Sequence, residues 1–289
     1  MLEAAIPLIP QLLWATNFVI SKIVVSSGLH PLALTAIRWT IATFLMYLYA
    51  RLVGMRISLD RSLSFLALTG ITGFSALIYL GLMFSKASIV GLTMAFIPIA
   101  TSILAAIFLK ERISKLVAAS VVLGSLGGIL LSAGNLNGLS WLGVLFGVLA
   151  SIDWGIYTVW SKKAMVELSP MELLVSISIL AQPVNWILAL PFLSIEPLLK
   201  EEVLLGTLYV SLVPGFVAYF LWLYSVKLIG ASRAGVYINA LPLFTLIISV
   251  LTLGERLDAF EVAGSALIIA ALTLVTVDYL NRTYRASRQ

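Results

Sequence analysis

Residues 87–112 read ASIVGLTMAFIPIATSILAAIFLKER, and residues 231–256 read ASRAGVYINALPLFTLIISVLTLGER. The two stretches align without a gap at an offset of 144. Both begin Ala-Ser, both carry a proline at the same place, as Pro98 and Pro242, and both close on Glu-Arg. Each contains an apolar run of the roughly 20 residues that a helix needs to cross a bilayer. The sequence therefore predicts two copies of one helical membrane unit.

A second, shorter match precedes each of these stretches, at an offset of 140. It pairs Trp14 with Trp154, Ser21 with Ser161, and Lys22 with Lys162. Together the two matches divide the chain into a first unit, residues 1–138, and a second unit, residues 139–289.

The composition indicates that most of the protein surface faces lipid. Of the 289 residues, 61% are hydrophobic and 11% are charged, and the mean hydropathy is +1.08. Soluble proteins carry about 25% charged residues, so water would solvate this surface poorly. The absence of cysteine excludes disulfides, thiolate metal sites and a cysteine nucleophile.

Ten apolar runs are long enough to span a membrane, and the connections between them are short. Because the runs are continuous rather than alternating, they are typical of helices and not of barrel strands. We expect an all-α integral membrane protein of ten transmembrane helices. The predicted spans are 6–25, 32–52, 63–84, 88–109, 116–133, 141–161, 171–193, 203–226, 233–253 and 260–280.

Lysine and arginine are distributed unevenly over the connections. If the N-terminus is cytoplasmic, the cytoplasmic segments hold thirteen of these residues and the opposite side holds three. Cytoplasmic segments are enriched in both residue types, so the count predicts that both termini are cytoplasmic. The thirteen are Arg51, Arg56, Arg61, Lys110, Arg112, Lys115, Lys162, Lys163, Lys227, Arg233, Arg282, Arg285 and Arg288. The three are Lys86, Lys200 and Arg256, while Lys22 and Arg38 lie within or at the ends of spans.

Five spans per unit is an odd number, so the second unit would enter the membrane in the opposite orientation. This inverted repeat is common among secondary transporters. Two similar bundles that face opposite ways can exchange conformations, which gives inward-open and outward-open states of similar energy.

At these motifs the chain resembles the EamA family of the drug/metabolite transporter superfamily. The resemblance rests on the run that ends at Glu111-Arg112, on its copy that ends at Glu255-Arg256, and on the weaker segment Trp14-Ala15-Thr16-Asn17. It implies ten helices, an inverted repeat, cytoplasmic termini and export of metabolites such as amino acids. It also implies a central cavity lined mainly by helices 1, 3, 4, 6, 8 and 9, and it leaves the substrate open.

Ionisable groups inside a bilayer cost about 2.5–3.5 kcal/mol by insertion scales, so each is expected to have a partner or a function. Asp153 lies near the middle of the predicted span 141–161. A surrounding of low dielectric favours its neutral form, which makes it a candidate to bind a proton or a substrate ammonium. The alternative is a structural hydrogen bond to a neighbouring helix. We favour the functional role.

Arg38 is a candidate clamp for a substrate carboxylate, because a guanidinium can donate two parallel hydrogen bonds. The alternative is an ion pair, or a side chain that extends to the interface or to carbonyls at a helix end. We favour this structural role, since the second helix is not a main cavity helix in the family that the chain resembles.

Further polar and aromatic residues fall within the predicted cavity helices. Asn17 and Trp14 lie on one stripe of the first helix, and Tyr157 follows Asp153 by one helical turn. An aromatic wall near an acid can hold a cation; packing between helices is the alternative for each. The remaining cavity candidates are Tyr79, Tyr219, Trp222, Tyr237 and Asn239.

Pro98 and Pro242 lie at equivalent places within apolar spans. Proline removes a backbone hydrogen bond and bends a helix, so this pair is predicted to form gating bends in helices 4 and 9. Fixed curvature around the cavity is the alternative.

These patterns favour a secondary transporter, not an enzyme, that exports an amino acid or a similar small polar metabolite, with proton entry as one source of energy. Two other classes stay open. An intramembrane enzyme acting on lipid would need paired catalytic groups, and a passive channel would need a ring of like polar groups. The expected partners are the substrate, the bilayer and protons. We expect no nucleic acid, no metal and no other cofactor, and a monomer or homodimer.

Overall fold

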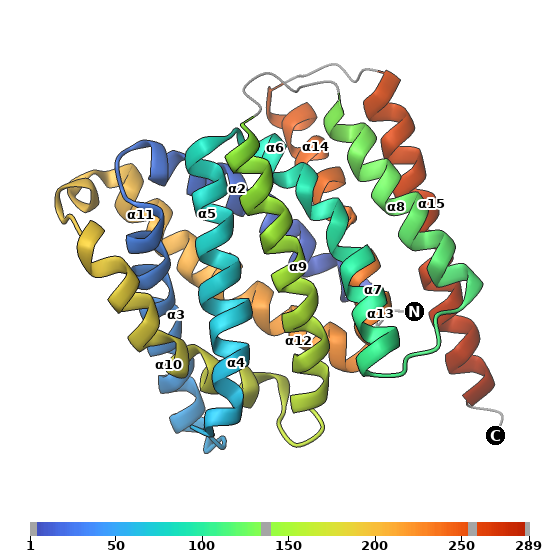
Figure 1. Ribbon diagram of the computed structural model, residues 1–289, viewed down its shortest axis with the longest axis horizontal. Helices are drawn as coiled ribbons and strands as arrows, with labels where there is room; N and C mark the ends of the chain where they lie inside the picture. Colours follow the sequence, from blue (N-terminus) through green and yellow to red (C-terminus); the bar gives the residue numbers. More distant parts are fainter. Residues whose placement is uncertain (1–4, 134–139, 254–258, 287–289) are drawn as a thin grey trace.

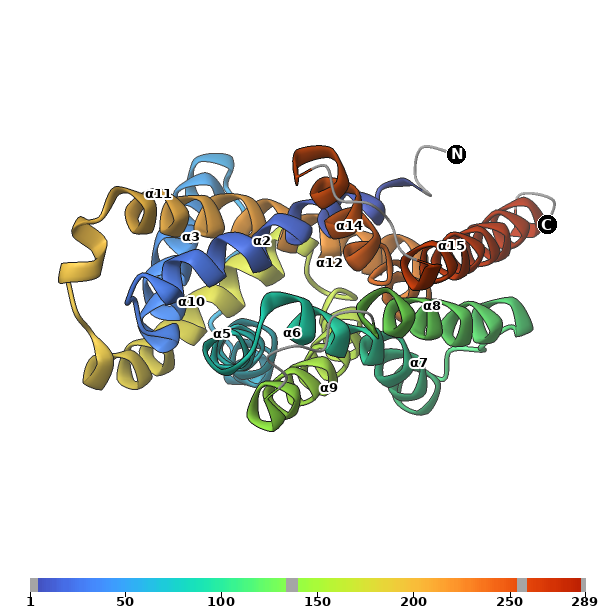
Figure 2. The same ribbon diagram turned by 90° about the horizontal axis from the view of Figure 1, so that it is seen from above.

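The computed structural model describes residues 5–133, 140–253 and 259–286, and these residues form helices and connections without a strand. Figures 1 and 2 show an elongated bundle, with α3, α10 and α11 towards one end, α8 and α15 at the other, and α2, α9 and α12 between them. The first unit contains α2 (Leu8–Ser26), α3 (Pro31–Val53), η1 (Arg61–Leu63), α4 (Ser64–Leu66), η2 (Ala67–Gly73), α5 (Phe74–Phe84), α6 (Ala87–Thr93), η3 (Met94–Phe96), α7 (Ile97–Phe108) and α8 (Lys115–Ala133). The second contains α9 (Trp141–Ala164), α10 (Pro170–Ala189), η4 (Leu190–Phe192), η5 (Glu196–Leu199), α11 (Glu201–Val210), η6 (Ser211–Val217), α12 (Ala218–Ile229), α13 (Ala231–Tyr237), α14 (Ala240–Leu253) and α15 (Ala259–Ala286).

Nine helical segments of the described chain are long and apolar enough to cross a membrane. They coincide with nine of the predicted spans, and the shorter apolar helix Lys115–Leu131 coincides with the remaining one, 116–133. The predicted all-α membrane fold is therefore confirmed. The connections after α3, α7 and α9 lie at the lower end of Figure 1, together with the C-terminal end of α15, whereas those after α2, α5 and α10 lie at the upper end.

Local sequence signals fix where several helices begin and end. Pro31 opens α3, the preceding His30 accepts a hydrogen bond from the Leu32 N–H, and Gly54, at φ +72°, ends the helix. The glycine takes this left-handed conformation without a Cβ clash. Helix α10 begins with a capping box, in which the side chains of Ser169 and Glu172 each bond the other's backbone N–H.

Both units contain a π-helical segment and a broken helix, and each pair is separated by 144 residues, the offset of the sequence repeat. The π-helical segments are η2, Ala67–Gly73, and η6, Ser211–Val217. The short helices α6 and α13 begin at Ala87 and Ala231, and each is seven residues long. The repeat in the sequence is therefore also a repeat of backbone irregularities.

Pro98 and Pro242 lie in the first turn of the segments that follow the two breaks, α7 and α14. A proline in this position loses no helical hydrogen bond, because the first-turn N–H groups have no partner within the helix. The breaks that follow α6 and α13 lie next to these prolines, in the two spans where the sequence predicted bends.

Glu111, the acidic residue of the first Glu-Arg pair, caps the N-terminus of α13. Its carboxylate accepts hydrogen bonds from the N–H groups of Ala231 and Ser232, at 3.0 and 3.1 Å, and from the Ser232 hydroxyl. A carboxylate is favourable at this position because the helix dipole and the free N–H groups are positive. The equivalent pair Glu255-Arg256 lies outside the described residues.

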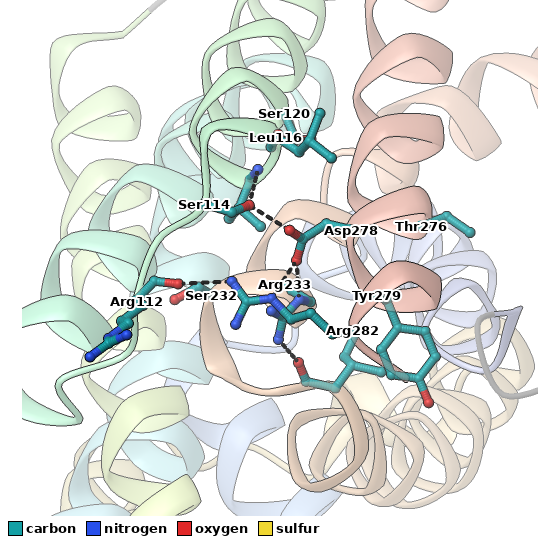
Figure 3. A network of polar contacts seen from close by, with 12 residues as sticks. Arg112, Ser114, Leu116, Ser120, Ser232, Arg233, Thr276, Asp278, Tyr279 and Arg282 are labelled. Atoms are coloured by element: carbon teal, nitrogen blue, oxygen red, sulfur yellow. Dashed lines mark hydrogen bonds and ion pairs between the residues drawn. The ribbon is translucent and has the colours of Figure 1, made fainter. Parts of the chain in front are cut away.

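Close by, Asp278 of α15 connects three elements at the lower end of the bundle. It accepts hydrogen bonds from Ser114, which precedes α8, at 2.6 Å and from Arg233 of α13 at 2.8 Å, and it pairs with Arg282 at 3.2 Å (Figure 3). This network connects the start of α8 with α13 and α15.

Small residues allow the helices at the right of Figure 1 to approach closely, as is common in membranes. A Cβ added to Gly127 of α8 would lie 2.7 Å from the carbonyl oxygen of Gly264 on α15, and one added to Gly264 would lie 2.7 Å from the carbonyl oxygen of Gly127. Two further pairs of glycines, each spaced by four residues, also face residues of the same chain: Gly124 and Gly128 in α8, and Gly143 and Gly147 in α9.

We therefore expect Gly127→Ala to destabilise the protein by about 1–3 kcal/mol, the usual cost of overfilling a packed contact. Thermal unfolding of the detergent-solubilised protein measures this loss. Gly91→Ala is the matched control, because an added Cβ at this helical glycine meets no atom within 4 Å. Equal stability of the two variants would contradict the close α8–α15 contact.

Candidate functional site

A cavity lies where the two units meet, and its lining comes from both of them. The volume open to the centre of a water-sized sphere is about 30 Å³, which is enough for one or two water molecules. In this conformation the cavity is therefore too small for an amino acid. Its lining residues are Trp14, Asn17, Phe18, Arg38, Phe74, Ser75, Ile78, Tyr79, Met94, Ile97, Trp154, Tyr219, Ile238 and Leu241.

Trp14 and Trp154, the two tryptophans paired by the sequence repeat, meet at the centre of this lining. Their ring centroids are 5.2 Å apart and the rings are nearly perpendicular. Tyr219 packs edge-on against both, at 5.6 and 5.3 Å, and Trp222 lies at 5.8 and 5.6 Å from the same pair. Perpendicular aromatic contacts are favourable beyond the area that they bury, so this cluster joins the two units.

Two hydrogen bonds cross between the units in reciprocal directions. The Trp14 indole N–H donates to the carbonyl of Pro214 at 3.0 Å, and the Tyr219 hydroxyl donates to the carbonyl of Gly70 at 2.9 Å. Gly70 lies in η2 and Pro214 in η6, and they are separated by 144 residues, the offset of the repeat. Each π-helical segment thus presents a carbonyl to an aromatic side chain of the other unit.

Arg38 reaches the cavity from α3, although the second predicted helix was not expected to contribute to the lining. The side chain is buried, with 3% of its surface exposed. It donates a hydrogen bond to the Tyr79 hydroxyl, and its guanidinium lies over the rings of Trp39 and Tyr79. Neither of the ion pairs found in the described chain involves Arg38.

Asp153 lies beside the cavity but not in its lining. A Cβ on Gly73 would be 3.0 Å from one oxygen of its carboxylate, and the other oxygen is buried without a hydrogen-bond partner. The carboxylate therefore faces the junction of η2 and α5, where the π-helix ends. It is partly exposed, unlike Trp154, the next residue along α9.

The other predicted site residues fall into three groups. Trp14, Asn17, Tyr79 and Tyr219 line the cavity with Arg38. Trp222 and Tyr157 lie behind it, and Tyr157 packs against Trp154 at 5.2 Å and against Gly70. Tyr237 and Asn239 are not among the lining residues: the Tyr237 hydroxyl is hydrogen-bonded with Thr276 of α15, and the Asn239 side chain lies against Gly124 of α8.

Two repeat-related lysines bind equivalent helix ends. Lys22 donates to the carbonyls of Leu82 and Ser85 at the end of α5, at 2.6 and 3.1 Å. Lys162 donates to the carbonyls of Val226 and Lys227 near the end of α12, at 3.1 and 2.8 Å. Cations are favourable at helix C-termini, where carbonyls lack partners.

Trp154 is a cavity residue that the sequence-based prediction of the site omitted. Its pairing with Trp14 in the repeat was the signal that could have identified it.

Within the described chain, no group of three or more histidine, aspartate or glutamate side chains gathers as metal ligands would. His30, which lies in the connection between the first two spans, stacks on Phe192, and burial lowers the pKa of its imidazole.

A cavity enclosed by two repeated helical units is the arrangement expected of a transporter, and comparison with known proteins gives the family. The model of the EamA-like transporter family matches residues 4–133 and again residues 141–277. The chain belongs to the EamA-like transporter family. Its members and relatives are transporters rather than enzymes, so this chain is a multi-pass membrane transporter.

Several relatives align with the transporter over nearly its whole length. An "Uncharacterized transporter" of Archaeoglobus fulgidus is 27% identical over 86% of this chain and 89% of its own. A "Probable terminal-alkyne amino-acid exporter" of Streptantibioticus cattleyicolor is 24% identical over 95% and 93%. A "Probable amino-acid metabolite efflux pump" of Salmonella typhimurium is 25% identical over 99% and 98%.

The transporter also shares its fold with a solved crystal structure. The two superpose with a TM-score of 0.81 at 17% identity, over 96% of this chain and 98% of the other. The helical arrangement is therefore retained where most side chains differ.

The reciprocal hydrogen bonds lead to a prediction for Tyr219→Phe. Removing the hydroxyl leaves the Gly70 carbonyl of η2 without its donor in a buried place, at a cost of about 1–3 kcal/mol. Thermal unfolding in detergent measures this loss. Tyr224→Phe is the control on the same helix, because Tyr224 is 40% exposed. Unchanged stability of Tyr219→Phe would mean that the bond contributes nothing.

Proposed function

We propose that the transporter exports an amino acid or an amino-acid derivative across the cytoplasmic membrane. The observation that carries this proposal is the small cavity between the two units, lined by aromatic rings and one buried arginine. Pockets for small metabolites are mostly apolar, with a few polar groups that fix orientation. Two relatives are named for amino acids or their metabolites, which agrees with a solute of this size.

Alternating access follows from this arrangement. We propose ten spans as two inverted five-helix units, residues 1–138 and 139–289, with the tenth span provided by α8. The equivalent π-helical segments and broken helices support the repeat, and an odd number of spans per unit inverts the second unit. The bends before Pro98 and Pro242 would then gate the cavity from opposite sides.

The orientation is part of the same proposal. The connections after α3, α7 and α9, at the lower end of Figure 1, and the helix ends beside them hold eight basic residues, whereas the connections after α2, α5 and α10 hold Lys86 and Lys200. This difference favours a cytoplasmic location for the lower end. The eight are Arg51, Arg56, Arg61, Lys110, Arg112, Lys115, Lys162 and Lys163. A reporter fused after Gln289 should therefore report a cytoplasmic C-terminus. A reporter that is active only outside would contradict both the ten spans and the inverted repeat.

Proteoliposomes provide the direct test of transport. Vesicles that contain the purified protein should exchange labelled L-phenylalanine or its N-acetyl derivative faster than empty vesicles, and excess unlabelled compound should compete. Extracellular metabolites of cells with and without the protein would then identify natural substrates. If neither labelled compound moves, and the medium of the two strains is the same, the proposal of amino-acid-type export is wrong.

Asp153 is the proposed site of proton coupling, because its carboxylate lies between α9 and the π-helical segment η2. We expect Asp153→Asn to insert normally but to lose the stimulation of transport by an imposed pH gradient, since an amide does not titrate. Asp60→Asn is the control, because Asp60 is exposed in the connection after α3. Equal pH dependence of Asp153→Asn and the wild type would leave Asp153 with a structural role.

A further inference from the structure

The charge of the cavity is unbalanced. Among the described residues that line it, Arg38 is the one that carries a full charge at neutral pH, and none is an aspartate or glutamate. A guanidinium is a positively charged group with donors and no acceptor, and that of Arg38 is buried. Its hydrogen-bond partner Tyr79 is a neutral phenol and leaves that charge in place.

The carboxylates on the elements that pack around α3 are engaged elsewhere or lie at helix ends. Glu172 of α10 caps its own helix with Ser169 and accepts from the backbone N–H of Arg56. Glu201 and Glu202 lie in the first turn of α11 and are exposed. Asp153 lies beside the cavity with its carboxylate facing Gly73. The described chain thus gives Arg38 no carboxylate within ion-pair distance.

The unpaired polar atoms of the lining also favour an anion, because they are hydrogen-bond donors. Two buried side-chain nitrogens of lining residues have no hydrogen-bond partner, Nε of Arg38 and Nε1 of Trp154. Both are donors, and no side-chain acceptor of a described lining residue is buried and unpaired. Buried donors are normally satisfied, so this cavity has a shortage of acceptors next to a positive charge.

The remaining lining is apolar and aromatic. Trp14, Phe74 and Tyr219 surround Trp154, with the Phe74 centroid only 4.3 Å from it. An apolar or aromatic group could intercalate among these rings when the cavity opens. An ammonium would find ring faces but no carboxylate in the described lining, and the guanidinium would repel it.

We propose that the transporter recognises its substrate as a monoanion: a carboxylate bound by Arg38, on an aromatic or branched apolar body, with the amino group absent or acylated. This inference rests on the proposed export function and narrows its substrate class. Arg38 and the donor of Trp154 supply the hydrogen bonds that a carboxylate accepts, and the aromatic cluster takes the body. A free amino acid brings a second charge for which the cavity has no partner.

Competition on the wild-type protein tests this without altering the fold. Four probes share one phenyl body: 3-phenylpropionate, N-acetyl-L-phenylalanine, L-phenylalanine and the uncharged 3-phenylpropionamide. Quenching of tryptophan fluorescence in detergent gives their affinities, and counterflow in proteoliposomes gives their transport. We expect both monoanions to bind roughly tenfold or more tightly than L-phenylalanine. We expect the amide to bind at least roughly tenfold more weakly than 3-phenylpropionate.

Variants then assign the selectivity to a residue. Arg38→Gln should bind 3-phenylpropionate and its amide equally, because the charge that distinguishes them is gone, and Arg38→Lys should keep part of the preference. Arg51→Gln is the matched control, since Arg51 lies exposed on the same helix. If Arg38→Gln does not fold, the wild-type comparison of acid with amide still decides the question.

The outcomes separate this inference from the function on which it rests. Tighter binding and faster transport of L-phenylalanine than of both monoanions would overturn the monoanion proposal and leave amino-acid export standing. Equal binding of 3-phenylpropionate and its amide to the wild type would also overturn it. Failure of the protein to move any of the four probes, with no change in the exported metabolites of cells, would remove both proposals.

Discussion

The structure depends on how two interrupted helices satisfy their backbones in lipid. The hydrocarbon core of a bilayer offers no water to an unpaired carbonyl, so every break in a helix needs a donor from elsewhere. At Gly70 and Pro214 the donors are Tyr219 and Trp14, each from the other unit. The irregular backbone therefore occurs where the two units meet, and the same contacts that satisfy it assemble the cavity lining.

The chemistry of the cavity follows from this arrangement. Since aromatic side chains supply both the hydrogen bonds and the packing, the centre of the transporter is a cluster of rings with little room for water. A charged side chain interacts strongly with other charges there, because the surroundings have a low dielectric and screen it weakly. Arg38 is such a charge, held by one hydroxyl and two ring faces. An arginine of this kind gives direction and charge selectivity to a site that is otherwise apolar.

The pseudo-symmetry extends to the helix ends. Lys22 and Lys162 bind carbonyls at the ends of α5 and α12, so the two units use one device at equivalent places. In an inverted arrangement these places would lie on opposite sides of the cavity. A change of conformation would then replace the contacts of one lysine by the equivalent contacts of the other. The inward-open and outward-open states would therefore have similar energies, and a transporter that alternates between them needs both to be populated.

The sequence by itself determined the fold class, nine of the helical spans to within a few residues, the repeat with its breaks near Pro98 and Pro242, and the family. These follow from hydrophobic run length, from the fixed chemistry of proline and from matches within the chain, all of which are local or periodic. The sequence also placed Trp14, Asn17, Tyr79 and Tyr219 on the correct helices. Their meeting in one cavity depends on which face each helix turns inward.

Only the tertiary structure decided the identity of the charged group in the cavity. From sequence, Asp153 near the middle of a span looked more exceptional than Arg38 near the start of one. In the structure the arginine side chain reaches the lining because its length and the close approach of Gly215 allow it, whereas Asp153 turns towards η2. Tyr237 and Asn239 turn away for the same kind of reason. The direction of a side chain depends on helix rotation and neighbouring packing, which no local pattern in the sequence encodes.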